Sequence, residues 1–245
     1  MKVLTLNTWQ ERDAWRERWD VTLGGIKRFS PDIAGFQELF NPAWAAEIQK
    51  LTGYSEMVFS DNKCGNVLYS NYPVKTWGVA TLTKSPLEEY FRYVLWAELE
   101  VRGKRLFIFN THFSWMLEDG GTRKKQAEEI LNLIQEKAPE AESLLMGDLN
   151  APPDSPEIKD LVKQGKFRDL ILEKYPHELR YTWDNQNPYV AGAYHQLPDR
   201  RIDYLLARGS GPLLKDWVSC EIVLTEPNSK GVRASDHYGV LAEFK

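Results

Sequence analysis

Polar residues suited to phosphate chemistry recur along the whole chain, and each follows or ends a short apolar run. They are Asn7, Glu38, His112, Asp148, Asn150, Asp203, Asp236 and His237. Hydrolysis of a phosphate ester needs neutralised phosphoryl oxygens, a water in line with the leaving group and a stabilised alkoxide. Carboxylates, amides and imidazoles can supply these functions together. If a single sheet brings the residues to one end, they form an active site for phosphate chemistry.

The short motifs around these residues resemble those of the endonuclease/exonuclease/phosphatase superfamily. In chain order they are Leu6-Asn7-Thr8-Trp9, Phe36-Gln37-Glu38, Asn110-Thr111-His112, Gly147-Asp148-Leu149-Asn150, Arg201-Ile202-Asp203-Tyr204 and Ser235-Asp236-His237. Each motif alone could occur by chance, but their order, spacing and strand-end positions match together. The stretch Thr182-Trp183-Asp184 is similar to one in sphingomyelinase-like and tyrosyl-DNA phosphodiesterase-like members, which favours those branches.

Glu38 is the residue that we expect to hold a divalent cation. It lies between an apolar strand and a helix that Asn41 should cap, whereas a lone glutamate after a strand is more often a surface carboxylate. Asn7 would add a neutral oxygen or orient Glu38, and Asp236 would reach a second metal ion or hold its neighbour's geometry. Mg²⁺ suits such a site because it binds few protein ligands and retains several waters. Mn²⁺ could replace it.

Asp148 and Asn150 lie two residues apart in a segment that, taken alone, predicts a tight turn. Their side chains could instead both face one bound phosphate. The resemblance implies that Asp148 activates or positions the water, and that Asn150 binds the phosphate or aligns Asp148. The pair divides these tasks because a carboxylate can accept a proton and an amide can donate to an oxyanion.

His112 and His237 are two of the four histidines in the chain. A single histidine is more often structural than catalytic, but Asp203 and Asp236 could brace this pair as imidazolium groups aimed at phosphoryl oxygens. A carboxylate partner raises the pKa of a histidine, and we expect Asp203 to orient one of the two. Members of the superfamily differ over which residue removes the proton from water, so Asp148 and His237 both remain candidates for the general base.

The irregular segment 181–198 is the predicted specificity loop. It is rich in turn-forming residues such as Gly192 and leads to a catalytic strand, and long loops in that position often carry function. Trp183 and Tyr189 are its candidate substrate contacts, with Tyr194 as a further aromatic residue. The alternative for each aromatic side chain is packing within a surface loop.

Arg123 and Asn66 are two further candidates for substrate contact. Arg123 lies at the start of a predicted helix, where a cation opposes the helix dipole but added positive charge could attract phosphate; a solvated basic turn is the alternative. Abasic-site endonucleases of the superfamily usually carry a Gly-rich segment with a tyrosine near Asn66. This chain departs from that pattern, which lowers the expectation of abasic-site activity and leaves Asn66 as the substrate-facing residue.

The composition predicts one globular domain over residues 1–245. The chain is 42% apolar and 12% aromatic, enough for a sizeable core, and no Pro/Gly/Ser-rich linker separates the motifs. Cys64 and Cys220 should be reduced, packed thiols. The residues before Asn7 leave no room for a signal peptide, and no run approaches the roughly 20 apolar residues of a membrane span. We therefore expect a cytoplasmic monomer.

Apolar periodicity predicts strands and helices in alternation. Strands are expected at 3–6, 33–36, 67–69, 93–101, 106–109, 143–146, 202–207 and 239–244, with a hairpin turn at 102–104, and helices at 15–26, 42–52 and 122–138. The Gly24-Gly25 pair weakens the first helix. The pattern alone predicts a mixed α/β protein. The resemblance implies a four-layer sandwich of two packed mixed or antiparallel sheets flanked by helices.

These observations predict a Mg²⁺-dependent phosphodiesterase that acts on a small molecule or a lipid head group. The net charge of -4 gives no global attraction to a polyanion, so nucleic acid is a disfavoured partner. A bound cation could still supply local positive charge. The alternatives are a nuclease or DNA-end-processing phosphodiesterase, and a non-catalytic binding protein, which should have lost residues such as Glu38, Asp148 or His237.

Overall fold

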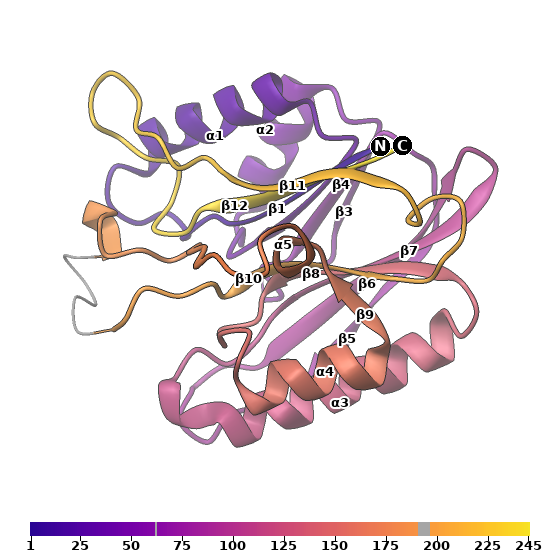
Figure 1. The fold of residues 1–245 in the computed structure, drawn as a ribbon. Helices are drawn as coiled ribbons and strands as arrows, with labels where there is room; N and C mark the ends of the chain where they lie inside the picture. The colour runs from indigo at the N-terminus through magenta and orange to yellow at the C-terminus, as the bar shows by residue number, and fades with distance from the viewer. Residues whose placement is uncertain (62, 191–196) are drawn as a thin grey trace.

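The computed structural model describes residues 1–61, 63–190 and 197–245 and contains two six-stranded sheets (Figure 1). The first sheet has the order β11 (Trp217–Val223), β12 (Gly239–Phe244), β1 (Lys2–Asn7), β2 (Ile33–Gln37), β4 (Val67–Ser70) and β3 (Glu56–Phe59). The second has the order β5 (Val74–Leu82), β6 (Arg92–Val101), β7 (Lys104–His112), β8 (Glu142–Asp148), β10 (Asp203–Arg208) and β9 (Phe167–Asp169). The β1–β2 and β7–β8 pairs are parallel and the other pairs antiparallel, so both sheets are mixed.

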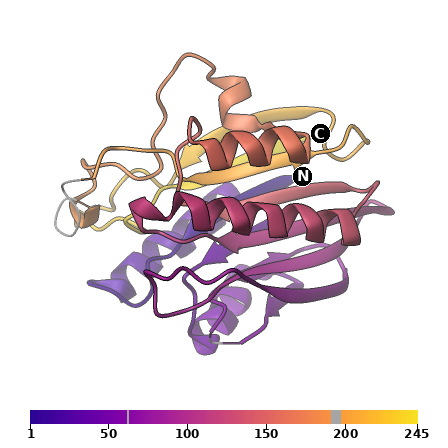
Figure 2. The same cartoon turned by 90° about the horizontal axis from the view of Figure 1, so that it is seen from below.

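Helices cover the outer faces of both sheets. They are α1 (Trp15–Phe29), α2 (Pro42–Thr52), α3 (Gly120–Lys137) and α4 (Pro156–Gly165), with a 3-10 turn η1 (Leu117–Asp119) before α3. The short α5 (Leu170–Lys174) instead packs between the sheets, where Leu170 and Ile171 join the central apolar cluster. Helices α1 and α2 lie on the first sheet and α3 and α4 on the second (Figure 1). Figure 2 shows α3 and α4 side by side across their sheet.

Three apolar clusters separate these layers. The cluster between the sheets includes Ile33 and Leu68 from one sheet and Leu95 and Ile108 from the other. A second cluster lies beneath α3 and α4, and a third beneath α1 and α2. The predicted α/β four-layer sandwich is therefore confirmed.

Local signals explain the elements that the sequence predicts best. The Asn41 side chain accepts a hydrogen bond from the Ala43 amide at 2.9 Å, Pro42 opens α2, and Gly53 ends it with φ 79°. The β6–β7 hairpin turns through residues 102–103, both with positive φ, as a two-residue hairpin requires.

Helix α1 is longer than its sequence predicts, because it continues through the glycine pair to Phe29. A Cβ at Gly25 would lie 2.2 Å from the side chain of Leu224. Glycine at position 25 therefore lets α1 pack closely on Leu224, the residue that follows β11. This tertiary contact outweighs the low helix propensity of glycine.

Cys64 and Cys220 are buried free thiols, as predicted, and burial raises the pKa of each. Within the described ranges, no helix is both long enough and apolar enough to cross a membrane.

Candidate active site

Strand pairing places the predicted residues at one end of the two sheets. Asn7 ends β1, and Glu38 directly follows β2. In the second sheet, His112 lies opposite Asp148 across β7 and β8, and Asp203 lies opposite Asp148 across β8 and β10. The Ser-Asp-His motif ends two positions before Gly239, the first residue of β12. Residues that are far apart in sequence therefore meet above the shared edge of the sheets.

The Oδ2 atom of Asp148 is the centre of the site. Asn7 donates its side-chain amide to this oxygen at 3.0 Å, while the Nε2 atoms of His112 and His237 lie 3.4 and 3.7 Å away. The other oxygen accepts a hydrogen bond from the backbone amide of Asn150 at 2.9 Å. Burial raises the pKa of Asp148 to about 7, against the opposing charge of His237. Asp148 can therefore gain or lose a proton near neutral pH.

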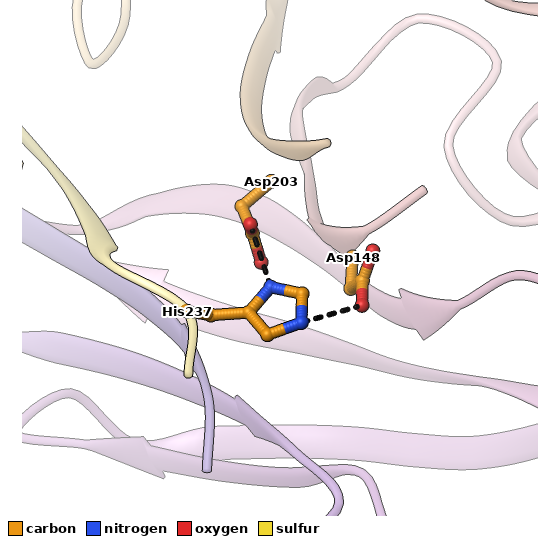
Figure 3. Close-up of side chains that lie close together, drawn as sticks. All are labelled: Asp148, Asp203 and His237. Carbon is orange, nitrogen blue, oxygen red and sulfur yellow. Dashed lines mark hydrogen bonds and ion pairs between the residues drawn. The ribbon is translucent and has the colours of Figure 1, made fainter. Parts of the chain in front are cut away.

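His237 lies between two carboxylates, as Figure 3 shows. Its Nδ1 atom is 2.9 Å from Oδ2 of Asp203, whose backbone amide donates to the Thr182 hydroxyl at 3.1 Å. Burial alone would lower the pKa of His237, but the charges of Asp203, Asp148 and Asp236 outweigh burial and raise it well above its usual value. His237 is therefore an imidazolium braced by a carboxylate, as the sequence predicts, and Asp203 positions it.

His112 differs from His237, and here the predicted imidazolium is wrong. Burial lowers the pKa of His112 well below its usual value, and the positive charges of Arg92 and His237 lower it further. The contact of His112 with Glu38 is 3.9 Å long, and its contact with Asp148 is 3.4 Å long. Neither carboxylate approaches closely enough to offset desolvation, which favours the neutral form of His112.

Unusual backbone conformations occur at the strand ends that carry the site residues. Glu38 and Asn150 have positive φ angles of 59° and 51°, which are uncommon for residues with a side chain. A Cβ at Gly147 would lie 1.9 Å from a carbonyl oxygen of β7, so only glycine fits there. The Asn150 side chain donates to the Phe113 carbonyl at 3.0 Å. Of the two predicted roles of Asn150, its contacts therefore support alignment of Asp148.

The charges around Glu38 suit a divalent cation. Asn7 approaches the Glu38 carboxylate at 3.5 Å, and within the described ranges the only ion pair of Glu38 is the long one with His112. Asp236 is buried, and its pKa is raised to about 6 by burial and by Glu38, against the charge of His237. Carboxylate oxygens are ligands that Mg²⁺ prefers, so Glu38 and Asp236 fit such an ion. The Asn7 oxygen accepts a hydrogen bond from the Trp9 amide at 3.0 Å while its nitrogen faces Glu38, so of its two predicted roles the contacts of Asn7 support orientation of Glu38.

Asp148, Asp203 and His237 form a second group that could share an ion, since one ligand atom from each lies within 4.8 Å of the others. The Nδ1 atom of His237 lies at hydrogen-bond distance from Asp203, so this nitrogen is already engaged. This geometry is that of an oriented histidine, and it favours the Glu38 side of the cavity for the cation.

A cavity of about 150 Å³ lies over these groups. Trp183 lines it, as predicted, and so does Trp115, which lies in an apolar stretch after His112 that the sequence left open between core and pocket lining. Tyr90, Arg92 and Arg200 also line the cavity and were not identified from the sequence. The Arg200 guanidinium lies 4.7 Å from the centre of the Trp183 ring, and its buried Nε has no hydrogen-bond partner among the described residues. Arg200 is therefore a candidate for phosphate contact, and its place just before the Arg-Ile-Asp-Tyr motif was the one available clue.

Asn66 and Arg123 lie outside the cavity lining. The Asn66 side chain is buried and donates to the Tyr93 carbonyl at 2.9 Å. The Arg123 guanidinium is buried at an ion pair with Glu157, 2.9 Å long, and donates to carbonyls of residues 114, 116 and 117. The contacts of both residues organise the surrounding loops. For Arg123 the carbonyls satisfy the donors that a buried guanidinium must pair.

Tyr189 also lies beside the cavity rather than in its lining. Its ring packs on Trp9 with 5.0 Å between ring centroids, and Trp9 itself lines the cavity. Gly192 and Tyr194 of the predicted specificity loop lie outside the described residues.

The family model described as the Endonuclease/Exonuclease/phosphatase family matches residues 5–237, and the chain belongs to that family. The match spans every motif from which the site is built.

The curated relatives include a phospholipase and a DNA phosphodiesterase. The chain is 25% identical over 200 residues to phospholipase C of Staphylococcus aureus, covering 72% of the chain and 59% of the relative. It is 23% identical over 239 residues to tyrosyl-DNA phosphodiesterase 2 of Xenopus laevis, covering 93% of the chain and 62% of the relative. The chain therefore spans less than two thirds of the length of either relative.

Solved structures show the same fold. Danio rerio tyrosyl-DNA phosphodiesterase 2 complexed with single-strand DNA product has a TM-score of 0.85 at 20% identity, with 100% of this chain and 98% of that chain covered. A beta toxin variant from Staphylococcus aureus with bound magnesium ions has a TM-score of 0.81 at 18% identity, with 100% and 99% covered.

Proposed function

We propose that this protein is a Mg²⁺-dependent phosphodiesterase acting on a small molecule or a lipid head group. The observation that carries the proposal is the convergence of Asn7, His112 and His237 on one oxygen of Asp148, beside the weakly neutralised carboxylate of Glu38. The presence of a phospholipase and a DNA phosphodiesterase among the relatives supports cleavage of a diester.

Metal binding, proton transfer and phosphate contact fall to different residues of the site. Glu38 and Asp236 would hold the cation, whose charge neutralises phosphoryl oxygens when it is bound, and Asn7 orients Glu38. Asp148 accepts the proton of the attacking water, because its pKa of about 7 suits a general base at neutral pH. His237 retains its proton and donates a hydrogen bond to a phosphoryl oxygen.

Neighbouring residues keep these groups in place. Asp203 orients the His237 ring through the 2.9 Å contact, and the Asn150 backbone amide fixes one oxygen of Asp148 so that the other faces the cavity. Arg200 would bind a non-bridging phosphate oxygen, since a guanidinium recognises phosphate well. Trp183 would contact the group attached to the phosphate.

Charge and cavity size favour a compact substrate over duplex DNA. The net charge is -4 and the cavity volume is about 150 Å³. Affinity for nucleic acid depends chiefly on neutralisation of many phosphates, which a compact cavity in an acidic protein does not offer.

A substrate panel tests the proposal. The purified protein is assayed with Mg²⁺, Mn²⁺ or EDTA against bis-p-nitrophenyl phosphate, p-nitrophenyl phosphate, sphingomyelin, plasmid DNA and a 5′-tyrosyl oligonucleotide. We expect metal-dependent hydrolysis of the small diester and of sphingomyelin, with little cleavage of the monoester or of plasmid DNA. Activity confined to the DNA substrates would make DNA-end processing the function, and undiminished activity in EDTA would refute the metal requirement.

A further inference from the structure

Large apolar side chains are exposed on two segments that border the active-site cavity. Of the eleven exposed large hydrophobic residues in the described part of the chain, five belong to the loop before β6 and the loop after β7. They are Leu87, Tyr90, Phe91, Trp115 and Leu117, and we call this set the apolar rim. Their relative exposures range from 37% to 52%, although an exposed cluster of such residues is unfavourable in water unless something covers it.

The two loops of the apolar rim are tied to one another by buried polar contacts. The Glu88 carboxylate accepts hydrogen bonds from Arg92 at 2.8 Å and from the Trp115 backbone amide at 2.8 Å. The Ser85 hydroxyl donates to Asp119 at 2.5 Å. The apolar side chains are therefore exposed on a braced scaffold.

Arg123 contributes to the same scaffold from α3. Its guanidinium donates to the carbonyls of residues 114, 116 and 117, and Glu157 neutralises its charge. These contacts hold the backbone on both sides of Trp115. They also explain why a cation occupies the first turn of a helix, where the dipole disfavours it.

The apolar rim is continuous with the catalytic cavity. Tyr90 and Trp115 belong to the rim and also line the cavity, next to Arg92. The exposed charged residues on the two loops are Lys84, Glu89 and Glu118, which together carry a net charge of -1. A surface of this kind suits a zwitterionic partner better than a polyanion.

Building on the proposed function, we propose that the apolar rim docks on a zwitterionic phospholipid surface and delivers lipid phosphodiesters to the cavity. Aromatic residues favour the boundary between head groups and acyl chains, where one part of the ring is apolar and the other is hydrated. Docking there would place Leu87, Phe91 and Leu117 against the acyl region and the neighbouring cavity at the level of the phosphates. A protein partner on the same surface would instead cover the cavity entrance.

Vesicle binding in the absence of turnover tests the proposal. Large unilamellar phosphatidylcholine vesicles are sedimented with the protein in EDTA, and the bound fraction gives a partition coefficient. The triple variant Leu87→Ser, Phe91→Ser, Leu117→Ser should reduce that coefficient about tenfold or more, because it removes the apolar area available for burial. The matched control replaces three exposed apolar residues elsewhere, Leu172→Ser, Leu179→Ser and Val218→Ser, and should bind as the wild type does.

A second measurement does not depend on loss of binding. Because both native thiols are buried, a polarity-sensitive dye on Leu87→Cys reports on the apolar rim. Its emission should shift to the blue on addition of the vesicles, whereas the same dye on Leu172→Cys should not respond. No vesicle binding by the wild type, equal loss in the rim and control variants, or no shift at residue 87 would each overturn the proposal. So would a concentration-dependent dimer that only the rim variant lacks, since the rim would then be a protein interface.

Hydrolysis of bis-p-nitrophenyl phosphate separates this proposal from the proposed function. The rim variant should retain the wild-type rate on this water-soluble diester with Mg²⁺, while its rate on vesicle lipid falls about tenfold or more, in step with binding. Failure of vesicle binding with intact diester hydrolysis would overturn docking alone. Binding without hydrolysis of any diester would overturn the proposed function alone.

Discussion

Buried charge is arranged differently in the scaffold of this protein and in its cavity. In the scaffold, Arg201 donates two hydrogen bonds to Asp169, at 3.0 and 2.6 Å, and the Arg18 side chain donates to five backbone carbonyls. In the cavity, the pKa of Asp148 is raised to about 7, and Oδ1 of Asp203 has no hydrogen-bond partner among the described residues. One region satisfies its charges internally, while the other leaves part of its charge uncompensated.

This difference separates residues that stabilise the fold from residues that await a ligand. A buried ion pair whose partners satisfy each other is part of the scaffold, and removal of one partner leaves an isolated charge. Uncompensated carboxylates and an unused guanidinium nitrogen are unfavourable for the free protein and become favourable when a cation or a phosphate binds. Substitutions in the two regions should therefore have opposite consequences for stability and activity.

The largest effect should come from Glu38→Ala. Loss of the main metal ligand should reduce Mg²⁺-dependent kcat/KM about 10³-fold or more, because the metal contributes several kcal/mol of transition-state stabilisation. The fold should persist, which thermal unfolding would verify. Glu47→Ala, at an exposed position on α2, is the matched control and should keep wild-type activity. Full activity of Glu38→Ala in EDTA would remove the metal from the mechanism.

Asp148→Ala and His237→Ala should each lower kcat by about 10²- to 10⁴-fold. The double variant should lose little more than the worse single variant, because residues that act on the same step are non-additive. Steady-state kinetics on bis-p-nitrophenyl phosphate measure all three. If the losses multiply in the double variant, the two residues act independently and the shared-oxygen geometry has no catalytic meaning.

In the scaffold, Asp169→Ala should destabilise the protein by about 3–5 kcal/mol, because it leaves the buried Arg201 charge unpaired. Urea unfolding measures this loss. Glu178→Ala removes the partner of exposed Arg180 and should change stability by no more than about 1 kcal/mol. Similar small effects of both substitutions would show that burial does not distinguish the two pairs.

Arg200→Met tests a buried arginine of the cavity whose Nε has no hydrogen-bond partner among the described residues. It should raise KM for the diester about 10- to 100-fold, since a charge-assisted hydrogen bond contributes about 1.5–3 kcal/mol. Stability should change little compared with Asp169→Ala, because no carboxylate is left unpaired by the substitution. Arg16→Met, at an exposed site on α1, is the control. An unchanged KM accompanied by a large loss of stability would move Arg200 into the scaffold group.

A further effect concerns pH in the absence of metal. The pKa of folded Asp148 is raised from 3.8 to about 7, so the folded state binds this proton more tightly than the unfolded state does. The contribution of Asp148 to stability must therefore fall as pH rises through that window. In EDTA, the Tm of the wild type should fall between pH 5 and pH 8 by several °C more than that of Asp148→Asn, because about two pH units of this window correspond to about 2–3 kcal/mol. Parallel Tm profiles would contradict the raised pKa.

The regular elements were predictable where a local signal and a buried face coincide. Helix α2 has its cap, first-turn proline and terminal glycine in the sequence, and the β6–β7 hairpin has an alternating strand followed by a short turn. The edge strands β5 and β11 were missed because they are only partly buried and so carry no continuous apolar run. Helix α4 was also missed, although Ser155 caps it and Pro156 opens it.

Within the site, the sequence by itself determined which residues could do phosphate chemistry and in what order they occur, because that information lies in short motifs at strand ends. Only the tertiary structure decided that Asp203 braces His237, that burial favours the neutral form of His112, and that Arg200 rather than Arg123 borders the cavity. The physical reason is that charge state and partnership depend on burial and on distances across strands. Asp203 and His237 are 34 residues apart in sequence and 2.9 Å apart in space, and no local pattern records that approach.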